Sequence, residues 1–125
     1  ELVSLRANEN IKIFGGAGGA YCVEEFSRGS IGTMPGSTMP DVWVKIWNNF
    51  ISGDVEEAFK IQNRFSPLIK ILSQTLGLSA FIYKYIMIRR GVFSEKSGYV
   101  RGPSLRPDNL HLEEIDMLLE ELELI

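Results

Sequence analysis

IKIFGGAGGAYCVEEFSRGSIGTMPG, residues 11–36, is the stretch that decides the fold of this chain. A β-rich run, Ile11–Phe14, ends in the glycine loop Gly15–Gly19, and a helical pattern then extends over Gly19–Arg28. A second short run, Ser30–Met34, follows it. A strand, a short helix and a strand predict two parallel neighbouring strands. Parallel strands belong to larger sheets that are covered on both faces. We therefore expect this chain to hold only part of a sheet.

The composition is that of a globular protein and excludes two kinds of partner. The chain has 125 residues, 45% of them hydrophobic, and a net charge of −3, so nucleic acid is not an expected partner. The apolar run Ala80–Ile88 is interrupted by Lys84 and is too short to span a bilayer. The lone cysteine, Cys22, cannot form an internal disulfide and is predicted to be packed. No signal peptide is recognised, and we expect a reducing compartment, the cytoplasm. Because the first residue is Glu1, we expect the sequence to start inside a longer one.

Helical patterns dominate on either side of this stretch. Glu1–Asn8 is typical of the last turns of a helix. From Pro40 onward, apolar residues recur at helical spacing in four stretches, at 42–51, 58–72, 81–88 and 110–122. The segment between the last two, 92–108, is predicted to be irregular because of its glycines and prolines.

Individual residues indicate where these helices begin and end. Asp54 is predicted to be an N-cap, followed by acidic residues in the first turn. Pro67 should break or kink its helix unless its ring faces an open groove. Gly77 is predicted to be a stop, and Ser79 the start of the next helix.

The glycine loop allows three interpretations. A loop between a strand and a helix could bind a phosphate at the helix N-terminus. However, Tyr21 stands where the dinucleotide fingerprint needs its third glycine, and the Gly-Lys-Ser/Thr of a P-loop is absent. The loop could also be only a tight turn that lets helix and strand approach closely. As a third possibility, the loops after the last two strands of a (β/α)₈ barrel commonly form an anion site.

Several motifs together resemble one enzyme family. The order of a strand, the glycines 15–19, a helix and Arg28–Gly36 (RGSIGTMPG) resembles the seventh and eighth strands of the dihydrodipicolinate synthase / N-acetylneuraminate lyase family. Further resemblances cover nearly the whole chain; they lie at Ser52-Gly53-Asp54, Phe65-Ser66-Pro67-Leu68, Tyr83-Lys84 with Arg90-Gly91, and Val100-Arg101-Gly102-Pro103.

The resemblance implies a fold class of α/β. The chain would be the C-terminal fragment of a (β/α)₈ TIM barrel, with its last two parallel strands, followed by a C-terminal helical region, and would be mostly helical by content. The expected domains are residues 1–53, a partial barrel with strands seven and eight, and residues 54–125, the C-terminal helical region.

The resemblance also implies chemistry. Members of the family are Schiff-base-forming lyases, class I aldolases or dehydratases, that act on pyruvate or another 2-keto acid through a lysine on the sixth strand and a tyrosine on the fifth. Neither strand is present here, so Lys12 and Lys84 are not assigned this role, and no catalytic residue, cofactor or metal is predicted. We expect the isolated chain to be inactive. The predicted substrate-binding residues share the loop and the second strand; they are Gly15, Gly16, Gly18, Gly19 and Met34, the last through its backbone carbonyl.

The expected partners are a 2-keto acid in the complete enzyme and, for the incomplete sheet, further copies of the chain or a complementary half-barrel. An alternative is a non-catalytic helical module that self-associates or binds another chain and carries a vestigial barrel unit. The remaining notable residues are expected to have structural roles only. His111 is expected at the start of a helix, and the acidic run at 113–123 is expected to form a solvated helix face. Trp43 and Trp47 are expected to take part in helix packing.

Overall fold

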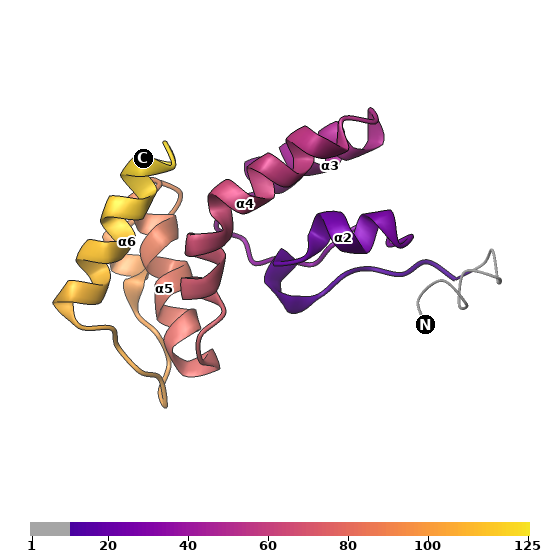
Figure 1. Ribbon diagram of the computed structural model, residues 1–125. Helices are drawn as coiled ribbons and strands as arrows, with labels where there is room; N and C mark the ends of the chain where they lie inside the picture. The colour runs from indigo at the N-terminus through magenta and orange to yellow at the C-terminus, as the bar shows by residue number, and fades with distance from the viewer. Residues whose placement is uncertain (1–10) are drawn as a thin grey trace. The chain divides into compact units, whose positions relative to one another are not determined.

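A computed structural model describes residues 11–125, with the side chain of Leu76 excepted. The described residues are mostly helical (Figure 1). The elements, in chain order, are the 3₁₀ turn η1 (Ala17–Gly19), the helices α2 (Cys22–Ser27), α3 (Pro40–Ile51), α4 (Val55–Leu72) and α5 (Leu76–Arg89), the 3₁₀ turn η2 (Glu95–Gly98) and the helix α6 (Asn109–Glu121). The helix predicted over Glu1–Asn8 lies outside the described residues.

The chain divides into two compact units. One runs to Ser66 and the other covers Pro67–Ile125, so the boundary falls inside α4. The helix α4 contains Pro67, so of the two predicted effects, a break or a kink, the break is absent. The domain division expected at residues 53 and 54 stays a prediction.

The two predicted strands lie parallel to each other but do not form strands in the described residues. One parallel bridge joins Gly15 and Thr33, in which Gly15 donates to the carbonyl of Gly32 at 2.8 Å and accepts from the N–H of Met34 at 3.2 Å. The carbonyl of Ile13 accepts from Ile31 at 2.9 Å. In a regular parallel ladder the donors to residues 13 and 15 would be two residues apart, but here Ile31 and Met34 are three apart. The extra residue acts as a bulge, so the ladder is interrupted.

Aromatic packing holds the first unit together. The ring of Phe26 on α2 meets the ring of Trp47 on α3 edge to face, with centroids 4.9 Å apart, and lies 5.3 Å from that of Phe50. Val23 on α2 and Ile46 on α3 are completely buried. Edge-to-face aromatic pairs contribute about 0.5–1.5 kcal/mol beyond their buried area. The predicted role in helix packing is confirmed for Trp47.

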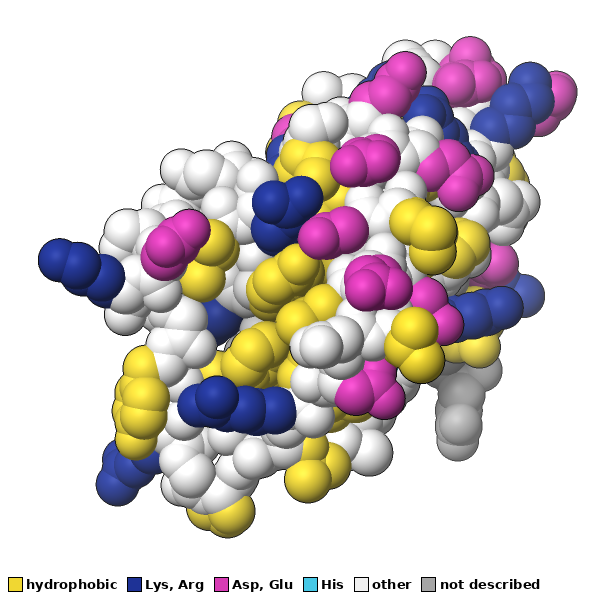
Figure 2. Space-filling view, turned by 90° about the vertical axis from the view of Figure 1, so that its left-hand side faces the viewer, with side chains coloured by type: hydrophobic (Ala, Val, Ile, Leu, Met, Phe, Trp, Pro, Cys, Tyr) yellow, Lys and Arg dark blue, Asp and Glu magenta, His cyan; other side chains and the backbone are white. Residues whose placement is uncertain are grey.

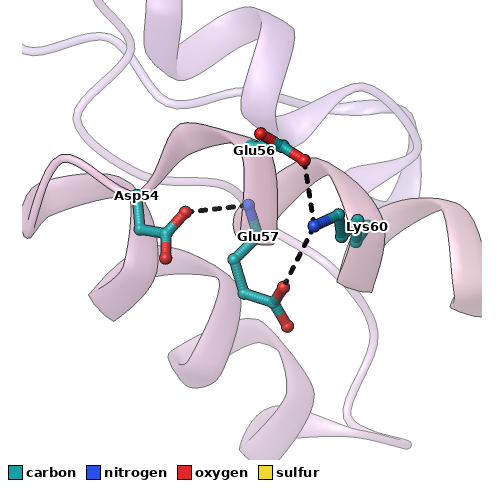
Figure 3. Close-up of polar contacts among 4 residues, drawn as sticks. All are labelled: Asp54, Glu56, Glu57 and Lys60. Atoms are coloured by element: carbon teal, nitrogen blue, oxygen red, sulfur yellow. Dashed lines mark hydrogen bonds and ion pairs between the residues drawn. The ribbon is translucent and has the colours of Figure 1, made fainter.

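The start of α4 follows the sequence prediction. Asp54 Oδ1 accepts from the backbone N–H of Glu57 at 3.1 Å, so Asp54 caps the helix (Figure 3). Lys60 Nζ lies 2.9 Å from Glu56 Oε1 and 3.9 Å from Glu57 Oε2, one turn further on (Figure 3). The hydrogen bond from Lys60 to Glu56 raises the pKa of the lysine. All three side chains are exposed or half-exposed, so these ion pairs add little to stability.

The start of α5 differs from the prediction. Thr75 is the N-cap, and its hydroxyl accepts from the N–H of Leu78 at 3.4 Å. Gly77 therefore lies inside the first turn and is not a stop. Ser79 does not start the helix either, because α5 begins at Leu76; the Ser79 hydroxyl lies 2.8 Å from the carbonyl oxygens of both Leu72 and Thr75.

In the second unit a polar contact ties α5 to α6. Asp116 on α6 accepts from the Tyr85 hydroxyl at 2.9 Å and from Arg89 Nε at 2.8 Å. The face of the molecule on the α6 side of Figure 1 shows acidic and hydrophobic side chains next to each other (Figure 2). Exposed glutamates of α6, among them Glu113 and Glu114, confirm the predicted solvated helix face. Within residues 11–125, no helix combines the length and hydrophobicity that spanning a bilayer needs.

Candidate functional site

The loop between the two parallel segments makes a tight left-handed turn. The N–H of Gly19 donates to the carbonyl of Gly16 at 2.9 Å. Three consecutive residues have positive φ, namely Ala17 at 49°, Gly18 at 62° and Gly19 at 84°. Such angles cost a residue with a side chain roughly 1–2 kcal/mol, so the two glycines meet a backbone requirement.

Close packing also requires a glycine at position 19, whereas only the flexible end of the Glu25 side chain lies against Gly15. A Cβ on Gly15 would lie 1.8 Å from Glu25 Oε2, and one on Gly19 would lie 2.7 Å from Cη2 of Trp43. Trp43 is only 8% exposed, so its indole has little room to move away. Real Cβ atoms do not approach other atoms this closely. The backbone of the loop therefore lies directly against α2 at one end and α3 at the other.

The structure brings Met34 and the loop together. The N–H of Met34 donates to the carbonyl of Gly15 at 3.2 Å, and its side chain is 68% exposed. The N–H groups of Gly16, Ala17 and Gly18 have no hydrogen-bond partner among residues 11–125. The predicted substrate-facing residues are thus contiguous, and three backbone donors there are available to a ligand.

Gln62 on α4 bonds to the start of α2, directly after the loop, and the sequence prediction missed it. Its Oε1 accepts from the N–H of Val23 at 2.9 Å and from the Cys22 thiol at 3.1 Å. Its Nε2 donates to Glu24 Oε2 at 2.8 Å. Gln62 is 3% exposed, and a glutamine within a buried helical stripe was the only signal that the sequence offered.

A shallow pocket of about 260 Å³ lies beside this site, also in the first unit. None of the predicted substrate-binding residues lines it; the lining comprises Phe26, Ile31, Gly32, Thr33, Pro35, Trp43, Val44 and Trp47. Its walls are apolar and aromatic. Thr33 Oγ1 and Trp43 Nε1 are buried and have no hydrogen-bond partner in the described residues. The sequence prediction assigned these residues to a strand and to helix packing, so the pocket was not foreseen.

The remaining reactive side chains of the described region have structural surroundings. Lys12 is exposed, and Lys84 donates to the backbone carbonyl of Tyr99. Burial raises the pKa of the Cys22 thiol to about 12, so the thiol is protonated and unreactive at neutral pH. The backbone N–H of His111 bonds to Asp108 at the start of α6, as predicted. No group of three metal-binding side chains occurs among residues 11–125.

The structure is similar to solved structures of dihydrodipicolinate synthases. The dihydrodipicolinate synthase from Rhodopseudomonas palustris is 28% identical and matches 97% of this chain with a TM-score of 0.87. A putative dihydrodipicolinate synthetase from Pseudomonas aeruginosa matches with 21% identity, covering 97% of this chain and 41% of that one, at a TM-score of 0.80. The synthase from Thermotoga maritima matches at 17% identity and a TM-score of 0.78, covering 96% of this chain and 39% of that one.

The chain spans only 41% of the length of the Rhodopseudomonas palustris protein, and the similarity is to its C-terminal part. No protein-family model matches the sequence, and no curated protein matches it. The resemblance predicted from the sequence is confirmed: the structure is similar to that of the C-terminal portion of a dihydrodipicolinate synthase.

Proposed function

We propose that this chain is the C-terminal part of a Schiff-base-forming lyase, an aldolase or dehydratase that acts on pyruvate or another 2-keto acid. One observation carries the proposal. The loop of residues 15–19 and the Met34 segment, which the family resemblance assigns to the substrate, are held together by a backbone hydrogen bond in a chain whose fold matches a dihydrodipicolinate synthase.

In this proposal the chain supplies one wall of the active site. Residues 1–53 form the last two strand-and-helix units of a (β/α)₈ barrel, and residues 54–125 form the helical region that follows the barrel. The Gly15–Gly19 loop faces the carboxylate or carbonyl of the keto acid with its free N–H groups, and Met34 presents its backbone carbonyl. The lysine that forms the Schiff base comes from sequence outside this chain, so neither Lys12 nor Lys84 reacts.

Borohydride trapping tests the proposal. The isolated chain and the complete protein that carries it are each incubated with pyruvate, reduced with borohydride and analysed by peptide mass spectrometry. Borohydride reduces the pyruvate Schiff base to a stable 1-carboxyethyl group on the lysine that formed it. We expect a stoichiometric adduct in the complete protein, on a lysine outside these 125 residues, and none on the isolated chain. A stoichiometric adduct on Lys12 would refute the assignment of roles.

A second candidate function is a non-catalytic association module. It is favoured by the exposed apolar side chains of the two parallel segments, where Phe14 is 52% exposed, Ile31 38% and Met34 68%. Apolar surface next to unpaired backbone groups favours pairing with another chain. If the complete protein forms no Schiff base while the chain associates with itself, this second function replaces the first.

A further inference from the structure

We propose that Gln62 is a positioning residue that fixes the substrate-facing loop from a distance, through the first turn of α2. The proposal rests on the proposed function, because the loop must bind a keto acid for its position to matter. Gln62 lies on α4, 39 residues after Val23, and does not contact the loop by any hydrogen bond.

The start of α2 lacks a cap of its own. The first N–H groups of a helix have no partner within the helix, and a side chain at the N-cap normally accepts from one of them. Tyr21 stands at that position and provides no such bond. The Oε1 atom of Gln62 takes its place, accepting from Val23 at 2.9 Å. Because Val23 is completely buried, water cannot replace this acceptor.

The amide of Gln62 has a fixed orientation. Its Nε2 donates to Glu24 at 2.8 Å, so its oxygen must face Val23 and the Cys22 thiol. A rotated amide would place two donors against the Val23 N–H and an acceptor against a carboxylate. Gln62 therefore both caps the helix and sets the direction of its first turn.

The position of the first turn of α2 also fixes the position of the loop, because few residues separate the loop from the helix. Only Ala20 and Tyr21 lie between Gly19 and the first residue of α2. At its other end the loop is held by the bridge between Gly15 and Thr33. Gln62 thus adds an anchor at the α2 end of the loop, beside the contact of Gly19 with Trp43, and without it we expect the loop to lose its fixed position.

The test uses the complete protein that carries this chain and four variants. Gln62→Met keeps the length of the side chain and removes all three hydrogen bonds. Gln74→Met makes the same change at an exposed glutamine and is the matched control. Gln62→Glu places a carboxylate beside Glu24, and the double variant Gln62→Glu/Glu24→Gln exchanges donor and acceptor so that the bonds can form again.

The readout is the pyruvate concentration that gives half-maximal borohydride trapping, together with the melting temperature. We expect Gln62→Met to raise this concentration about tenfold, the effect of one buried hydrogen bond, and Gln74→Met to leave it unchanged. The double variant should return within about twofold of the wild type, while Gln62→Glu alone should not. The positioning role would be overturned if Gln62→Met lowered only the melting temperature. It would also be overturned if the double variant needed as much pyruvate for half-maximal trapping as Gln62→Glu.

Two further outcomes, a wild type that traps no pyruvate and a Gln62→Met variant that does not fold, are judged by other measurements. If the wild type traps no pyruvate, the proposed function fails, and Gln62 is then judged by amide hydrogen exchange. We expect Gln62→Met to speed exchange at the hydrogen-bonded amides of Gly19, Ala20 and Val23 at least about tenfold while α6 is unchanged, and equal exchange in Gln62→Met and Gln74→Met would overturn the inference. If Gln62→Met does not fold, the comparison of Gln62→Glu with the double variant decides.

Discussion

The substitution Gly19→Ala tests how the loop is held. Gly19 has a φ of 84°, where any residue with a side chain pays roughly 1–2 kcal/mol. The new Cβ would also lie 2.7 Å from Cη2 and 2.9 Å from Cζ3 of Trp43, a buried side chain. Overpacking of this kind costs roughly 1–3 kcal/mol. Together these terms predict a loss of about 3 kcal/mol in the free energy of unfolding.

Gly16→Ala is the matched control in the same loop. Gly16 has a φ of −125°, and nothing lies within 4 Å of the position that a methyl group would take there. An alanine there meets no clash and should change stability by less than about 1 kcal/mol.

Urea unfolding followed by circular dichroism and tryptophan fluorescence compares the two variants with the wild type. Since 1 kcal/mol corresponds to roughly 3–6 °C for a chain of this size, Gly19→Ala should also melt about 10 °C lower. If Gly19→Ala loses no more stability than Gly16→Ala, the loop does not pack on Trp43.

Four other experiments have defined expected results. Gly18→Val, at a φ of 62°, should lower the affinity of the complete enzyme for 2-keto acid more than its stability, measured by pyruvate trapping and thermal melting; an equal or larger loss of stability would contradict a substrate-facing loop. Burial raises the pKa of the Cys22 thiol from 9.0 to about 12, so the thiol stabilises the folded state below pH 9 and this stabilisation is lost as the pH rises toward 12. Chemical denaturation at pH 9 and pH 11 should therefore show a larger drop in the free energy of unfolding for the wild type than for Cys22→Ala, and equal drops would contradict the burial of the thiol. Asp54→Ala should cost about 1 kcal/mol by removing the cap of α4, as read from urea unfolding, whereas Asp54→Asn should cost little. Light scattering of the isolated chain at several concentrations should show self-association, and a monodisperse monomer of 14.1 kDa at high concentration would contradict the open sheet edge.

The helices were predictable where a local signal marks them. Asp54 and Asp108 are N-caps whose side chains bond three residues ahead, and both α4 and α6 begin within one residue of the helix start that the sequence indicates. At α5 the local signal misled, because Gly77 is tolerated inside a helical turn and the cap is provided by Thr75. A local signal therefore predicts a helix start only where no second candidate, such as Gly77 and Ser79 beside Thr75, competes with the residue that caps it.

The strands and the anchor of the loop were less predictable, for a different reason. An alternating or apolar run gives no information on register, so the extra residue between Ile31 and Met34 is visible only once both segments are paired. Likewise, the bonds from Gln62 to Cys22 and Val23 join residues about forty positions apart. The glycines of the loop were identified correctly as a backbone feature, but their packing partners, Glu25 and Trp43, depend on tertiary structure.

The position of Gln62 limits how this polypeptide can be recombined. A chimera joined at Gly53, between α3 and α4, would inherit the loop and α2 from one parent and the acceptor for Val23 from the other. We expect such an exchange to keep the loop in place if the incoming side chain at position 62 accepts from Val23 and matches residue 24, or if residues 22–24 are transferred with it. The same requirement applies to mutations in nature. A change at residue 62 that breaks its hydrogen bond to residue 24, without a compensating change there, should be selected against although neither residue touches the reacting atoms.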